Sequence, residues 1–161
     1  MKTALLFAWS AAVCCCSWTE AAEPVQLKFD THDGYFVSNK FEPKAAQSYV
    51  VIGSQEQFDQ VFGAAFVMGD RSHRLPEKAF DTLMVIAVVH RGKAMVEYKV
   101  RTVELVDGVV QLHYTADRKP QGSAEFACPL IVSIPKGDYR AVRFIEGKQP
   151  VNTRELGGKQ P

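Results

Sequence analysis

The chain has 161 residues and a formal net charge of +1, with 19 basic and 18 acidic side chains spread along its length. This balance excludes the strongly basic surface that nucleic-acid binding requires, so we expect no nucleic-acid partner. Hydrophobic residues make up 47% of the chain, enough for the core of one ordinary domain.

Residues 1–22 have the pattern of a secretory signal peptide. Lys2 supplies the positive charge, an apolar run follows, and small residues precede a cleavage site near Ala21 or Ala22. The apolar run is shorter than the roughly 20 residues that a bilayer span requires, so we predict cleavage and no membrane span. We therefore expect a secreted or periplasmic protein. A lipoprotein is the alternative, because Cys14–Cys16 offer thiols for lipidation.

Cleavage would remove three of the four cysteines and leave only Cys128. The mature chain could then form no internal disulfide, although it enters an oxidising compartment, and its stability must come from a packed core. Cys128 lies in the apolar segment Phe126–Val132. This setting predicts a buried small side chain and not a reactive thiol.

The N-terminal part of the mature chain is predicted to form strands. Val25–Phe29 alternates apolar and polar residues and ends at the turn cluster Asp30–Gly34, so Tyr35–Val37 is expected to pair back onto it. Ser48–Ile52 is a third strand, because its aromatic and β-branched residues suit a pleated sheet.

One helix is predicted, beginning after Ser54. The Ser54 side chain can cap the first turn, Gln57 stands three residues later as in a capping box, and Gly63 can end the helix. The helix carries an apolar stripe that must pack on one face of a sheet, formed by Phe58, Val61 and Phe62.

A long connection and a buried strand follow the helix. Residues 64–80 show no sustained periodicity, which predicts a connection over the surface. Thr82–Val89 is the most continuous apolar run of the mature chain. Its length predicts a central strand that is buried on both faces.

The next two strands are predicted to form a hairpin. Met95–Val106 alternates, but its phase slips near Arg101–Thr102, so a β-bulge is expected there. Asp107–Gly108 is a strong hairpin turn that leads into the alternating segment Val110–Tyr114.

The C-terminal part contains two further strands. Residues 117–123 are expected to form a loop before Phe126–Ile134, in which Pro129 indicates an edge position or a bulge. Tyr139–Ile145 is the last strand, and the polar residues after it are expected to fray. The predicted organisation is thus a signal peptide over 1–22, one globular domain over 23–146 and a flexible polar tail over 147–161. The predicted fold class is mainly β (α+β), an antiparallel sheet or sandwich with one short capping helix.

The segment Cys128–Lys136, continued by Tyr139–Phe144, resembles the C-terminal domain of the PrcB family of bacterial protease-complex subunits, and it also resembles small exported bacterial proteins of unassigned function. The resemblance covers residues 80–146 and implies an antiparallel β-rich fold. It also implies a non-catalytic protein-binding module, such as a protease-associated subunit or modulator. The family usually has a Thr-Gly-Gly-Tyr turn where this chain has His90–Ala94, so the family's choice of partner does not transfer.

The sequence contains no His-Glu-x-x-His, Cys-x-x-Cys, Gly-x-Ser-x-Gly or phosphate-loop motif. We therefore predict a binding module that acts on a protein partner, with no catalytic activity and no cofactor. Its binding residues are expected in two polar loops or along a free sheet edge that adds a partner strand. The candidates are Asp70, Arg71, His73 and Arg74 in the first loop and His90, Arg91 and Lys93 in the second.

Two alternatives remain. One is a small metal-dependent hydrolase with a zinc site made of His73, His90 and His113. The other is a ligand pocket between the sheet and the helix. Asp30–Asp33 is the densest group of ligand-type residues, but a polar turn closed by Gly34 explains it without a metal.

Overall fold

The computed structural model describes residues 23–65 and 73–156. The predicted signal peptide, the candidate residues Asp70 and Arg71, and the last five residues lie outside the described residues. The strands are β1 (Val25–Gln26), β2 (Asp30–His32), β3 (Tyr35–Val37), β4 (Gln47–Ile52), β5 (Phe62–Ala64), β6 (Leu83–Gly92), β7 (Ala94–Val106), β8 (Val109–Pro120), β9 (Phe126–Pro135), β10 (Ala141–Glu146) and β11 (Gln149–Glu155). The helices are α1 (Gln55–Val61) and the short 3₁₀ helix η1 (Ala79–Asp81).

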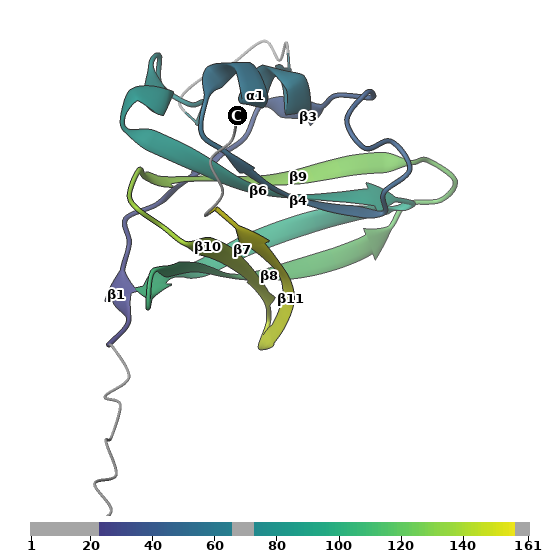
Figure 1. Ribbon diagram of the computed structural model, residues 1–161. Coiled ribbons are helices and arrows are strands. Elements are labelled where there is room, and N and C mark those ends of the chain that lie inside the picture. Colours follow the sequence, from purple (N-terminus) through teal and green to yellow (C-terminus); the bar gives the residue numbers. More distant parts are fainter. Residues whose placement is uncertain (1–22, 66–72, 157–161) are drawn as a thin grey trace, which may run out of the picture.

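Two sheets pack face to face, and α1 covers the outer face of one of them (Figure 1). The first sheet has the strand order β1-β7-β8-β10-β11, and the second has the order β2-β9-β6-β4. A small pair, β3 with β5, lies beside α1. This arrangement confirms the predicted mainly-β fold with one short capping helix. The described helices are too short and too polar to span a membrane.

Strand β6 contributes to two separate cores. Ile86 and Val88 pack between the two sheets, whereas Val85, Ala87 and Val89 pack under α1, and all five are fully buried. Because successive strand residues point to opposite faces, only a strand that is covered on both faces can be apolar at every position. The predicted central strand is therefore confirmed.

Helix α1 begins as predicted. The Ser54 hydroxyl accepts a hydrogen bond from the backbone N–H of Gln57 at 3.3 Å. The predicted end is wrong, because Phe62 is already extended and begins β5, where it pairs with Val37. Gly63 thus lies in a strand, and its missing Cβ leaves room for the ring of Phe36.

The predicted bulge and hairpin in the first sheet are both confirmed. The pairing of β7 with β8 shifts register between Val100 and Thr102. Asp107 and Gly108 connect these strands with φ values of 48° and 75°. Two consecutive positive φ values are typical of the type I′ turn, whose twist matches that of the flanking strands.

The N-terminal pairing differs from the prediction. Val25–Phe29 is not a single strand, because β1 pairs with β7 in the first sheet and β2 then pairs with β9 in the second. Leu27 and Phe29 pack against the core between the sheets as the chain crosses over. The predicted turn Asp30–Gly34 therefore includes β2, and Tyr35–Val37 pairs with β5 instead of pairing back.

The C-terminal part brings two more differences. Strands β8 and β10 are parallel neighbours, because β9 between them belongs to the other sheet, so the first sheet is mixed. Residues 149–155, expected in a frayed tail, form β11 and pair antiparallel with β10. The Arg154 Nε–H also donates to the Tyr49 carbonyl oxygen at 3.0 Å, which ties β11 to the second sheet. The predicted loop over 117–123 is shorter, since β8 continues to Pro120.

Candidate functional site

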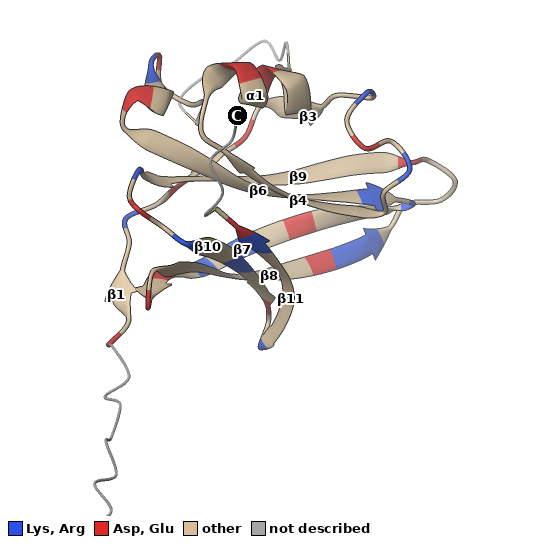
Figure 2. Cartoon of the chain, in the orientation of Figure 1, with Lys and Arg blue, Asp and Glu red and all other residues tan. Residues whose placement is uncertain are grey.

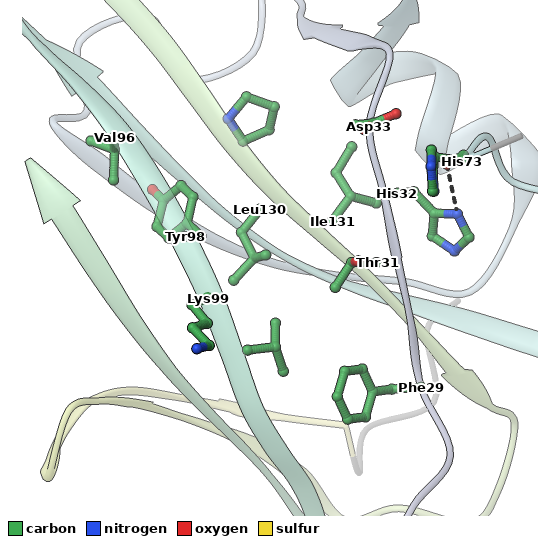
Figure 3. Close-up of a pocket in the computed structure, with 12 residues that line it drawn as sticks. Phe29, Thr31, His32, Asp33, His73, Val96, Tyr98, Lys99, Leu130 and Ile131 are labelled. Atoms are coloured by element: carbon green, nitrogen blue, oxygen red, sulfur yellow. Dashed lines mark hydrogen bonds between the residues drawn. The ribbon is translucent and has the colours of Figure 1, made fainter. Parts of the chain in front are cut away.

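A groove of about 540 Å³ opens between the two sheets, on the side where β7 and β9 lie. Figure 3 shows Tyr98 and Lys99 on β7 along one wall, and Thr31, His32 and Asp33 along the other. Apolar side chains form much of its floor, contributed by Phe29, Val96, Val100, Pro129, Leu130 and Ile131. His73 completes the polar end of the groove.

The groove exists because β1 and β2 are short. Among the described residues, β1 pairs only with Leu105 and Glu104 of β7, and the Leu27 N–H then donates to the Val103 carbonyl at 2.8 Å. Strand β2 pairs only with Ile131–Ser133 of β9. On this side the first part of β7 and the first part of β9 are therefore not paired with a described strand, although β3 runs close to β9 and Cys128 of β9 contacts β7.

The exposed part of β9 has few free backbone groups. Pro129 has no N–H to donate, and the Tyr98 hydroxyl donates to the Cys128 carbonyl oxygen at 3.4 Å. Pro129 is paired with Val89 on the β6 side only, which confirms its predicted edge position. A proline and a covered carbonyl are devices that protect a sheet edge from further pairing.

The edge of β7 is more accessible than the edge of β9. The Val96 N–H points away from β8 and donates to the Cys128 sulfur at 3.4 Å, whereas the Lys99 carbonyl points to Thr115 on β8. Because backbone groups alternate in direction along a strand, those of Tyr98 and Val100 also face away from β8. Between Val96 and Thr102, β7 is thus paired on one side only among the described residues.

The side chains of β7 alternate in burial along the strand, and the exposed Lys99 also lines the groove. Val96 is buried and Tyr98 and Val100 are partly buried, and burial raises the pKa of the Tyr98 hydroxyl. Glu97, Lys99 and Arg101 are exposed. After the bulge the inward position passes to Val103, which is fully buried.

The acidic and basic side chains along this edge of β7 do not balance. Glu97 is paired with Lys119 on β8 at 2.7 Å, whereas Lys99 and Arg101 form no ion pair within the described part of the chain. Figure 2 shows acidic and basic residues along β7 and β8, while almost all of the β9 ribbon is uncharged. The free edge of β7 therefore carries a net positive charge.

A hydrogen-bonded pair of side chains closes the polar end of the groove. The His32 Nδ1–H donates to the His73 carbonyl oxygen at 3.1 Å, which leaves Nε2 to accept from the Ser133 hydroxyl at 2.8 Å. Burial lowers the pKa of His32, against the opposing effects of Asp30 and Asp33. Ser133 is only 1% exposed, so this pair attaches the segment around His73 to β9.

Cys128 also differs from its prediction, because it is partly exposed and not buried. Its sulfur and its carbonyl oxygen both bind β7, through Val96 and Tyr98. The residue thus links the two sheets at one end of the groove.

Of the five predicted binding residues that the structure describes, two lie at this groove or beside it. His73 lines it, and Arg74 lines a smaller adjoining cavity of about 210 Å³ together with Ser133. Arg91 serves another purpose, because its guanidinium donates to the Phe41 carbonyl and the Ser48 hydroxyl, both at 2.8 Å.

The other two candidates of the second loop do not join Arg91 in a common site. His90 is on β6 and lies opposite Cys128 of β9. Burial lowers the pKa of the His90 side chain. Lys93 is exposed at the turn between β6 and β7, where its carbonyl accepts from the Gln121 N–H at 3.0 Å. The second predicted loop is therefore divided among three different surroundings.

The three histidines of the predicted zinc site lie apart. His73 lies beside His32, His90 is on β6, and the His113 Nε2 lies 4.0 Å from Glu104 on the outer face of β8. Over residues 23–65 and 73–156, no group of three or more His, Cys, Asp or Glu side chains is placed to hold a metal ion.

Sequence reasoning did not single out the residues that form the groove, notably Phe29, Tyr98, Lys99 and Leu130. Two features of the sequence indicated this region. They are the change in the apolar–polar alternation near Arg101 and the proline within β9. Comparison with protein-family models, curated proteins and solved structures finds no match to this chain. The resemblance to the PrcB family therefore stays a prediction.

Proposed function

We propose that this protein is an exported, non-catalytic module that binds a partner protein by adding an extended segment of it to the open edge of β7. The observation that carries the proposal is this one-sided strand beside the 540 Å³ groove. Unpaired backbone N–H and C=O groups at a sheet edge are a template for another strand, and several peptide-binding domains use them in this way.

The open edge has defined ends. The Val96 N–H is occupied by the Cys128 sulfur at one end, and the Val103 carbonyl is occupied by Leu27 at the other. At about 3.3 Å per residue, the space between them accepts a strand of about five residues. Alternate side chains of that strand would enter the groove beside Phe29 and Leu130.

The proposal can be tested with a fluorescein-labelled peptide, Val-Thr-Val-Thr-Val, and the variants Val100→Pro and Val100→Thr. Proline removes the N–H that faces the open edge and is tolerated at sheet edges, whereas threonine keeps the N–H and the branched shape. We expect fluorescence anisotropy to show binding to the wild type and to Val100→Thr, and at least tenfold weaker binding to Val100→Pro. Urea unfolding of each variant confirms that it is folded.

Hydrogen exchange locates the bound peptide. We expect slower exchange of the Tyr98 and Val100 amides on binding. Protection confined to β4 or β11, the outer edges at the other side of the sheets, would contradict the proposal. Equal binding by Val100→Pro would contradict it as well.

Export and the class of partner are separate parts of the proposal. N-terminal sequencing of the protein from the exported fraction should begin at residue 22 or 23 if the signal peptide is cleaved after Ala21 or Ala22. The PrcB-like segment favours a protease complex as the partner. Co-purification of such a protease with the wild type, and its loss with Val100→Pro, would support that class.

A further inference from the structure

We infer that the segment bound at the β7 edge is a strand of about five residues in which apolar side chains alternate with acidic ones. This inference rests on the proposed strand addition and names the chemistry of the partner. It is carried by the different surroundings of the two faces of β7 at its open edge.

The inner face selects apolar side chains. A strand paired with β7 would place every second side chain beside Tyr98 and Val100, above Phe29 and Leu130. These four side chains already pack against the core between the sheets. Apolar groups of the partner would thus continue an existing core, whereas charged groups there would lose their water.

The outer face selects acidic side chains. Lys99 and Arg101 are exposed and form no ion pair among the described residues. The neighbouring Glu97 and Asp117 share a single cation, Lys119, at 2.7 Å and 3.8 Å, so together they offset only one of these two positive charges. Side chains directly opposite each other on paired strands lie about 5 Å apart at Cβ, and opposite charges at that separation attract.

The acidic residue nearest the groove does not reverse this preference. Asp33 lies on the β2 wall, and Figure 3 shows it across the groove from Lys99 and Tyr98. A strand added to β7 therefore meets the two cations first. Arg101 is the unpaired residue of the bulge between Val100 and Thr102, and Lys99 lies two residues before it, so both positive charges lie within the open edge.

The experiment compares three labelled peptides, Val-Glu-Val-Glu-Val, Val-Thr-Val-Thr-Val and Val-Lys-Val-Lys-Val, by anisotropy on the full mature protein. We expect the glutamate peptide to bind about tenfold more tightly than the lysine peptide at low salt, with the threonine peptide between them. The ratio should shrink in 0.5 M NaCl, because exposed charges are screened.

Variants identify the residues responsible. The double substitution Lys99→Gln and Arg101→Gln should bring the affinities of the glutamate and lysine peptides to within about twofold of each other, whatever change it makes to the affinity for the threonine peptide. Arg143→Gln is the matched control, because Arg143 is an exposed cation of the same sheet on β10, two strands away. It should leave all three affinities unchanged.

The outcomes separate the inference from the proposed function. Equal affinity for all three peptides, with protection of the β7 amides, would overturn the acidic preference and keep strand addition. If no peptide binds and sedimentation shows a dimer that Val100→Pro dissociates, a second copy of the chain occupies the edge, and both the inference and the proposed partner are wrong. If no peptide binds to a monomer, both are likewise wrong.

Discussion

The Tyr98 hydroxyl donates a hydrogen bond to the Cys128 carbonyl oxygen across the space between the two sheets, at 3.4 Å. The contact ties the open edge of β7 to the protected edge of β9 and closes one end of the groove. A single side chain thus lines the proposed binding surface and removes an acceptor that would otherwise attract another strand.

Replacing Tyr98 with phenylalanine should destabilise the fold. The substitution keeps the ring and leaves the Cys128 carbonyl without this donor, so we expect the free energy of unfolding to fall by about 0.5–1.5 kcal/mol in urea titrations. Tyr139→Phe is the comparison, because its hydroxyl bonds to the Pro135 carbonyl at an exposed turn. A loss from Tyr98→Phe no larger than the loss from Tyr139→Phe would argue against a special role for Tyr98.

Removing the helix cap should weaken α1. Ser54→Ala deletes the hydroxyl that accepts from the Gln57 N–H, and N-cap losses of this kind cost about 1 kcal/mol. Ser123→Ala lies in an exposed loop and should change stability by less than about 0.5 kcal/mol. Thermal or urea unfolding distinguishes the two, and equal stability of both variants would mean that the cap is not needed.

His32 should make the fold less stable in mild acid. Burial lowers its pKa in the folded state below the ordinary value of 6.5, so the unfolded chain takes up a proton first as the pH falls. The contribution is fully present above pH 6.5 and is progressively lost as the pH drops through that value towards the folded pKa.

The variant His32→Gln tests this pH dependence. It keeps an amide donor and an acceptor but cannot be protonated, so its stability should fall less than that of the wild type between pH 7.5 and pH 5.5. His90, whose pKa is also lowered by burial, titrates in both proteins and cancels in the comparison. Parallel stability curves for the two proteins would show that His32 does not contribute.

Removing β11 should cost much of the stability of the fold. A chain that ends at Glu146 loses the β10–β11 ladder and the Arg154–Tyr49 hydrogen bond. About five ladder bonds at about 1 kcal/mol each predict a loss of several kcal/mol. Arg154→Ala removes only the link to Tyr49 and should cost about 1 kcal/mol. A truncated protein as stable as the full chain would show that residues 149–155 behave as the tail that their polar composition suggested.

The local features of the fold were predictable because neighbouring residues decide them. The Ser54 cap depends on one hydroxyl near the next turn, and Asp107–Gly108 can adopt the positive φ values that a tight hairpin needs. The bulge before Thr102 followed from the change in phase of the apolar residues along one strand.

The groove was not predictable in the same way, since no single segment contains it. Of the candidate binding residues within the described part of the chain, His73 and Arg74 lie at it or beside it, while Arg91 donates hydrogen bonds to the backbone around Phe41. The surface depends on where β1 and β2 stop pairing, and pairing between distant strands leaves little trace in the local pattern.

By itself, the sequence determined that the chain is rich in strands, that Ser54 caps a helix and that β6 is buried on both faces. The spacing of apolar residues, helix capping and turn chemistry each depend on a few neighbouring residues. Only the tertiary structure decided that β8 and β10 run parallel, that 149–155 form a strand, and that part of β7 pairs on one side only among the residues described. Hydrogen bonds between strands join residues far apart in the chain, so the neighbours of each strand are set by how the whole sandwich packs.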